Sequence, residues 1–218
     1  MSHRPDPVTA KETAVQFTPH PADLYPMVCV DCIDLGERVK SFKGETPYLA
    51  HCVTLVFQSG EKNAEGRLHE VSREFTVSMG KKASLRAFLE SWRSKGYTEE
   101  EARAGVELHK LVGANALIAV EHVTSAATGR TYANIRSISK LPKGMSAPML
   151  PPYERPAFFT EKAAKYAEEV RVYRDAATPL PTSARVAGPT TLTPHDGYDE
   201  PPVGLAPSED DQDDTLPW

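Results

Sequence analysis

The sequence has few cysteines and no long apolar run. Only three cysteines occur in 218 residues, and no apolar stretch approaches the roughly 20 residues of a membrane-spanning helix. The first thirteen residues are polar and lack the apolar stretch of a secretory signal peptide. We therefore expect a cytoplasmic protein without a membrane partner, in which the thiols stay free.

Signatures of catalysis are also absent. The chain has no phosphate-binding loop, no HExxH motif and no nucleophile elbow. The acidic run at residues 99–101 is interpreted as a solvated helix start, and the seven histidines form no spacing motif. We expect a binding protein that is not an enzyme, with no catalytic residue, no cofactor and no metal.

Positive charge is missing from the C-terminal end. Residues 186–218 contain no Lys or Arg but eight acidic residues, whereas residues 1–145 carry 19 Lys and Arg against 17 Asp and Glu. So acidic a segment cannot bury enough apolar surface to offset its chain entropy. Residues 176–218 are therefore predicted to be a disordered acidic tail.

Runs rich in apolar and β-branched residues predict five strands, at residues 24–34, 48–57, 68–79, 117–123 and 131–141, and the third run also alternates with period two apart from one break. Gly36 is expected to end the first strand, and the dipeptide Ser59-Gly60 is expected to turn the second into a loop at residues 61–66.

Between the third and fourth strands the spacing of apolar residues predicts a helix over residues 85–92. Ser84 is its expected N-cap and Gly96 its expected C-terminal glycine. Thr98 and Glu101 have the spacing of a capping box, which predicts a second helical turn.

The resulting order, β-β-β-α-β-β, is that of an OB fold, an all-β five-stranded barrel with one helix between strands three and four. We expect a flexible lead-in at residues 1–21, the OB-fold domain at 22–145 and a Pro-rich segment at 146–175. That segment contains a possible lone helix at residues 160–173, capped by Thr160.

The last nine residues form an acidic run that ends in an aliphatic residue, a proline and a terminal aromatic. A ring of this kind can fill an apolar pocket while the carboxylates meet a basic rim. The predicted partner-binding residues are Asp210, Asp211, Asp213, Asp214, Leu216, Pro217 and Trp218.

This ending resembles the tip of bacterial single-stranded-DNA-binding proteins, which in that family binds replication and repair enzymes. Thr215 departs from the family's usual Asp, Leu216 replaces Ile and Trp218 replaces Phe. The alternative is an ordinary acidic tail that happens to end in tryptophan.

A second resemblance covers residues 113–144, with Gly129 before Tyr132, the run Ala-Asn-Ile at 133–135 and the ending Leu-Pro-Lys-Gly at 141–144. This region is similar to OB-fold single-stranded-DNA-binding proteins of phage replication clusters. The resemblance implies a protein of phage DNA replication, recombination or repair, in the host cell cytoplasm, that protects single-stranded DNA.

Single-strand binding needs cations for the phosphates and aromatic faces for the bases. Period two places an aromatic, an amide and a cation on one face of the fifth strand, and a cation and a ring on one face of the third. A further group lies in the loop after the first strand. The candidates are Lys40, Phe42, Lys43, Arg73, Phe75, Tyr132, Asn134 and Arg136. The alternative for each is a core ring or a solvated surface charge.

Cys29, Cys32, His51 and Cys52 could in principle form a Cys₃His zinc site. In regular strands, however, positions 29 and 32 face opposite ways, and so do positions 51 and 52. We favour buried small side chains for these cysteines.

The sequence therefore predicts a single-stranded-DNA-binding protein that recruits partner proteins through its tail. Whether it is a monomer or a homo-oligomer is left open by the sequence. Other hypotheses remain open: an RNA or duplex-junction reader, a metal-dependent nuclease that uses the acids of the body, and a structural phage protein without affinity for DNA.

Overall fold

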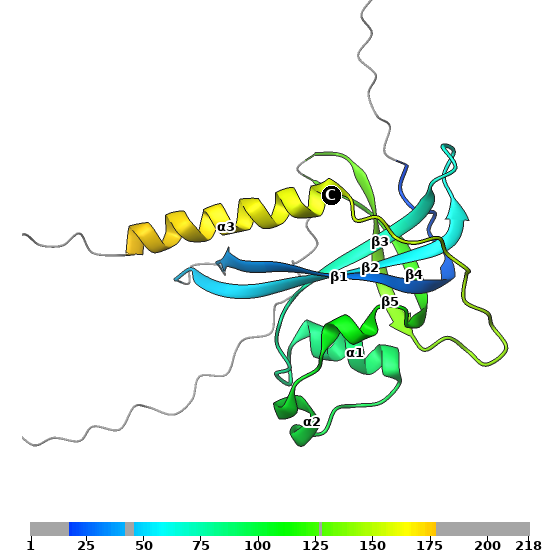
Figure 1. Ribbon diagram of the computed structural model, residues 1–218, viewed down its shortest axis with the longest axis horizontal. Helices are drawn as coiled ribbons and strands as arrows, with labels where there is room; N and C mark the ends of the chain where they lie inside the picture. The colour runs from blue at the N-terminus through cyan, green and yellow to red at the C-terminus, as the bar shows by residue number, and fades with distance from the viewer. Residues whose placement is uncertain (1–17, 42–45, 127, 178–218) are drawn as a thin grey trace, which may run out of the picture.

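The computed structural model describes residues 18–41, 46–126 and 128–177, which form one five-stranded antiparallel sheet with helices on both of its sides (Figure 1). The strands are β1 (Leu24–Lys40), β2 (Tyr48–Lys62), β3 (Leu68–Thr76), β4 (Asn115–Thr124) and β5 (Thr131–Ser139).

The order of strands across the sheet is β3-β2-β1-β4-β5. The central strand β1 pairs with β2 through most of its length and with β4 through its first residues, so the strongly bent sheet brings β5 round toward β3. This confirms the predicted OB-type fold class. Across the seam between β3 and β5 the described residues form no hydrogen-bonded ladder, so the barrel is open there.

Strand β1 continues six residues beyond its predicted end, because Gly36 is part of a β-bulge and does not terminate it. The backbone of Gly36 has φ +73°, and its N–H donates to Asp34 Oδ1 at 2.8 Å. The register shifts twice, so Val30 and Leu35 are the extra residues of two bulges. Both pack on the same outer side of the sheet.

The hairpin between β2 and β3 also differs from the prediction. β2 runs through Ser59 and Gly60 to Lys62, and the turn is built by Asn63, whose Oδ1 accepts hydrogen bonds from the N–H groups of Glu65 and Arg67. Ser59 is buried within the strand and does not form the expected turn.

Between β3 and β4 lie α1 (Ser84–Arg93), α2 (Glu99–Ala104) and a 3₁₀ turn (Leu108–Leu111). The capping box of Thr98 and Glu101 is confirmed. Two other expectations were wrong. Ser84 is the first helical residue rather than the cap, and Ser94, not Gly96, takes the left-handed conformation that ends α1.

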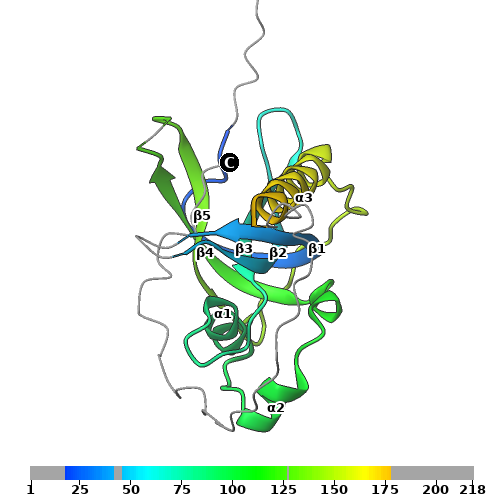
Figure 2. The same ribbon diagram turned by 90° about the vertical axis from the view of Figure 1, so that its left-hand side faces the viewer.

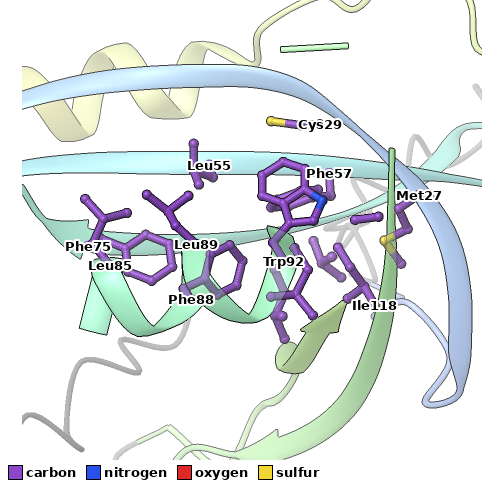
Figure 3. Close-up of a cluster of buried hydrophobic side chains, with 14 of the residues drawn as sticks. Met27, Cys29, Leu55, Phe57, Phe75, Leu85, Phe88, Leu89, Trp92 and Ile118 are labelled. Carbon is purple, nitrogen blue, oxygen red and sulfur yellow. The ribbon is translucent and has the colours of Figure 1, made fainter. Parts of the chain in front are cut away.

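The main core lies between the inner side of the sheet and α1 (Figure 3). Phe88 and Trp92 of α1 pack against Phe57 and Phe75 of the strands, with ring centroids 4.7–6.2 Å apart. Trp92 Nε1 also donates to the carbonyl of Asn115 at 2.9 Å, so α1 is fixed to the start of β4.

The C-terminal helix α3 (Ala157–Ala177) lies along β1 and β2 on the outer side of the sheet, opposite α1 (Figure 2). It begins directly after Pro156, three residues before the predicted cap Thr160. It is not a lone helix, because Phe159 and Tyr166 pack on Ile33 and Val56 in a second core. No helix among the described residues is both long and apolar enough to span a membrane.

A buried charge cluster fixes α3 to the sheet. Glu74 of β3 is 7% exposed, and its carboxylate lies 2.7 Å from Lys162 Nζ of α3 and 3.1 Å from Arg38 Nη1 of β1. Tyr166 donates its hydroxyl to the same carboxylate at 3.0 Å. Burial raises the pKa of Glu74, but the hydrogen bond and charge of Lys162, with Arg38 and Tyr166, outweigh it and lower the pKa overall.

Three further contacts hold the segment around α3 in place. Arg155 makes two hydrogen bonds to Asp31, at 2.7 and 2.9 Å, Arg174 pairs with Glu37, and the hydroxyl of Tyr173 donates to the carbonyl of Pro47. In both ion pairs the sheet supplies the acid and the C-terminal segment supplies the base, as in the pair of Glu74 and Lys162.

We predict that Glu74→Gln lowers the free energy of unfolding by about 3 kcal/mol at neutral pH, because it leaves Lys162 buried without its counter-charge. The lowered pKa of Glu74 means that its stabilisation is present above the unfolded carboxyl pKa and lost as pH falls through the folded one. The difference between wild type and variant should therefore shrink in acid. Chemical denaturation at several pH values measures it, with Glu168→Gln on the exposed face of α3 as the control. Equal effects of the two substitutions at pH 7 would contradict the assigned role of Glu74.

Candidate nucleic-acid interface

The loop after β1 carries three of the predicted residues, of which one is described. Lys40 ends β1, and its Nζ donates to Thr76 Oγ1 of β3 at 2.8 Å. Phe42 and Lys43 lie outside the described residues. Tyr48, which the sequence analysis did not select, pairs across the hairpin with Lys40 and is 48% exposed. An aromatic residue next to a basic loop was the signal that could have identified it.

Phe75 is a core residue, which corrects the prediction that its ring is presented to a base. It is 0% exposed and packs on Phe88 with ring centroids 4.7 Å apart (Figure 3). Arg73 lies half-buried beside these rings, with its Cζ 5.3 Å from the centroid of Phe75 and 5.8 Å from that of Phe88. The face that the two residues share points toward the interior of the barrel.

On β5 the three predicted residues have different surroundings. Tyr132 is 5% exposed, so its ring is not presented to solvent, and this corrects the expectation that it stacks on a base. Asn134 is half-buried and lies opposite Glu121 of β4. Arg136 is exposed, because a bulge in β5 leaves it without a partner in the β4–β5 register.

The open seam brings two of the predicted arginines together from distant parts of the chain. Arg73 Nη1 of β3 donates to the carbonyl of Ile135 at 3.4 Å, and that carbonyl belongs to the peptide group that precedes Arg136. The side chain of Arg73 therefore reaches the backbone at the β5 bulge, where Arg136 projects into solvent. The sequence predicted both residues but gave no reason to expect that Arg73 contacts the backbone next to Arg136.

The segment that contains β5 is free of acids. No Asp or Glu occurs between Glu121 and Glu154, and the segment holds four Lys and Arg residues. All four are exposed: Arg130, Arg136, Lys140 and Lys143. We call these four residues the β5 cations. A run of exposed cations without nearby carboxylates in the chain favours contact with phosphate groups.

The outer side of β1 and β2 has the opposite character. It presents Asp31, Glu37 and, from β3, Glu74, and each carboxylate is paired with a base from the segment around α3. Between them the apolar side chains are covered by Phe159 and Tyr166. This side of the sheet is therefore covered by α3, and the charged side chains that the sheet supplies to these ion pairs are acidic.

Three histidines that are far apart in the sequence meet at one end of the sheet. His20 is 1% exposed, with its Nδ1 3.0 Å from the carbonyl of Pro21 and its Nε2 2.8 Å from Ser59 Oγ. His122 Nε2 donates to the carbonyl of His20, and His69 lies 4.9 Å from the His20 ring. Burial, above all, lowers the pKa of His20 and of His69. His20 is therefore fixed to the barrel, although the sequence predicted a flexible lead-in at this position.

The cysteines lie on both sides of the sheet. Cys29 is buried in the main core and Cys52 in the core beneath α3, each at 0% exposure, while Cys32 is half-buried. Burial raises the pKa of Cys29 to about 12 and that of Cys32 to about 11, so both are protonated thiols at neutral pH. His51 pairs with Asp34 at 2.8 Å. Among the residues that the structure describes, no group of His, Cys, Asp or Glu could hold a metal ion.

The predicted partner-binding tip, Asp210 to Trp218, lies outside the described residues. No family model, no curated protein and no solved structure matches the chain.

The variant Phe75→Leu distinguishes a core role of this ring from a base-stacking role. If Phe75 is a core residue, the substitution should lower the free energy of unfolding by about 1 kcal/mol, because it nearly conserves apolar volume, and should leave oligonucleotide affinity within a factor of two. Denaturant unfolding and a binding titration of the same preparation measure both quantities. A large loss of affinity in a variant that remains folded would restore Phe75 as a base-stacking residue.

Proposed function

We propose that this chain binds single-stranded DNA with little sequence preference and does not act on it chemically. The observation that carries the proposal is the strand order β3-β2-β1-β4-β5 with helices between β3 and β4. Five-stranded barrels of this type bind oligonucleotides and oligosaccharides.

Electrostatics support the same proposal. The described barrel has a local concentration of cations on β5 and its flanks, although residues 1–145 carry a net charge of only +2. Affinity for a phosphate backbone depends on local potential, because at about 0.1 M salt a charge is screened beyond roughly 10 Å. A single cationic surface on a near-neutral body can therefore bind a strand.

The acidic C-terminal segment has a second role in this proposal. Its terminal Leu-Pro-Trp sequence offers an apolar anchor and its aspartates offer charge, which suits a basic pocket on a replication, recombination or repair protein. A chain that holds DNA at one end and a partner at the other would bring enzymes to protected single strands.

The direct test is an anisotropy titration of the full chain with fluorescein-labelled oligo-dT of about 16 nucleotides, the upper site size of one OB fold. We predict saturable binding that weakens steeply as salt rises, and weaker binding to a duplex of the same length. An external label is needed because Trp92 is 7% exposed and hydrogen-bonded within the core, so its emission cannot report stacking on bases.

Any of the following results would reject the proposal, and each would indicate a different function. Preference for oligo-U over oligo-dT would indicate an RNA reader, and preference for the duplex would indicate a junction binder. Cleavage of the labelled strand with Mg²⁺ or Mn²⁺ would indicate a nuclease. A lack of affinity for every oligonucleotide would favour a structural protein.

Removal of residues 209–218 should tighten DNA binding severalfold at low salt, because the aspartates of the tip compete with phosphates for the same cations. The two chains should converge as salt rises, since screening weakens the competition. Trp218→Ala is the matched control, because it removes the anchor and keeps every aspartate. Equal affinities of the full and shortened chains at low salt would rule out this competition.

A further inference from the structure

We infer that the DNA strand runs along the seam between β3 and β5, over Arg73 and the β5 cations, and not across the side of the sheet that α3 covers. This inference rests on the proposed function and names the surface that would perform it. Three observations support it: α3 covers one side of the sheet, acidic residues of the sheet lie on that side, and Arg73 contacts the backbone at the seam next to the exposed Arg136.

The side beneath α3 is unsuited to phosphate even if the helix were to leave. Its three ion pairs would open, and the sheet would present the carboxylates of Asp31, Glu37 and Glu74, with Arg38 between them. It would also expose the apolar residues that now lie under Tyr166. Displacement of α3 would therefore create an acidic and apolar surface, which repels a polyanion.

The seam has the opposite chemistry. Arg73 comes from β3 and Arg136 from β5, and the hydrogen bond from Arg73 to the Ile135 carbonyl fixes the two strands at this point. Stacking on Phe75 and Phe88 holds the guanidinium of Arg73 at the seam. The bulge turns Arg136 into solvent, where its guanidinium can contact phosphate oxygens.

The other β5 cations extend this surface beyond the seam. Lys140 and Lys143 follow the last residue of β5, and Arg130 precedes its first. On the β4 side the surface is bounded by Glu121, which faces Asn134 in the register. The carboxylate of Glu121 therefore favours a path on the β3 side of β5.

Exposed aromatic rings are few here, since Phe75 and Tyr132 are buried. Phosphate contacts should then supply most of the affinity. If the three exposed cations at and after the bulge, Arg136, Lys140 and Lys143, each neutralise one phosphate, log K should fall against log salt with a slope of about −2, because each contact on a single strand contributes about −0.7.

Charge reversal at the bulge tests the path. Arg136→Glu should reduce oligo-dT affinity about tenfold at low salt and make the slope shallower by about 0.7, whereas Arg136→Lys should retain most of the affinity. The matched control is Lys165→Glu, which makes the same change of charge at an exposed position of α3. The control should bind as wild type does. Circular dichroism should show that all three variants are folded.

The outcomes distinguish a wrong DNA path from a wrong proposed function. If wild type binds and Lys165→Glu weakens binding as much as Arg136→Glu, the strand lies along α3 and the inference is wrong. If wild type binds and neither substitution weakens it, the seam is not the path. If wild type does not bind oligonucleotides at all, the proposed function itself fails.

A second variant tests whether α3 must leave the sheet before DNA can bind. Tyr166→Ala removes the ring and hydroxyl that fix α3 over Glu74, so it weakens the attachment of the helix without a change of charge. We expect unchanged DNA affinity at a temperature where the variant is folded. An increase in affinity would show that α3 blocks the true surface and would overturn the inference.

Discussion

The burial of Glu74 between Arg38 and Lys162 is the constraint on which the arrangement of this molecule depends. A carboxylate at 7% exposure is costly without partners, and two of its partners, Lys162 and Tyr166, come from α3, far along the chain. The ion pair therefore fixes α3 to the outer side of the sheet. Once α3 is fixed there, one side of the barrel is closed, and any ligand must bind elsewhere.

The bulges of β1 shape the outer side of the sheet, on which α3 packs. A regular strand alternates its side chains between the two sides, which places Leu35 on the same side as Ile33. The first register shift also brings Val30 to that side. The outer side of β1 thus becomes apolar enough to bury Phe159 and Tyr166. In β5 a bulge has a different consequence, because it places a cation, Arg136, beside the seam. The same backbone irregularity creates a packing surface in one strand and an exposed charge in the other.

Much of the fold could be predicted from the sequence, because the positions of strands and helices along the chain follow from local patterns. The five strands, the helix after β3 and the capping box of Thr98 depend on residues close in the chain. The bulges could not be predicted. A glycine such as Gly36 is found both where a strand ends in a turn and where the strand continues through a bulge. Phe75 was assigned wrongly for a related reason, since period two identifies two sides of a strand but does not tell which of them faces the core.

The candidate surface was predictable only in part. The sequence selected Arg73 and Arg136 separately, but the contact of Arg73 with the backbone next to Arg136 depends on how the sheet bends, which no local pattern specifies. The contact of α3 with the barrel depends on pairs such as Lys162 with Glu74 and Arg155 with Asp31, which join residues about ninety and more positions apart. Such pairings are not visible in a single sequence, because each charge taken alone is typical of a solvated surface.

Hydrogen–deuterium exchange of the full chain, with and without saturating oligo-dT, tests the central claim that α3 stays on the sheet while DNA occupies the seam. The account predicts that the amides of α3 exchange at the same slow rate in both states, and that DNA slows exchange in β5 and in the residues that follow it. Faster exchange of α3 in the presence of DNA, with new protection of β1 and β2, would contradict it.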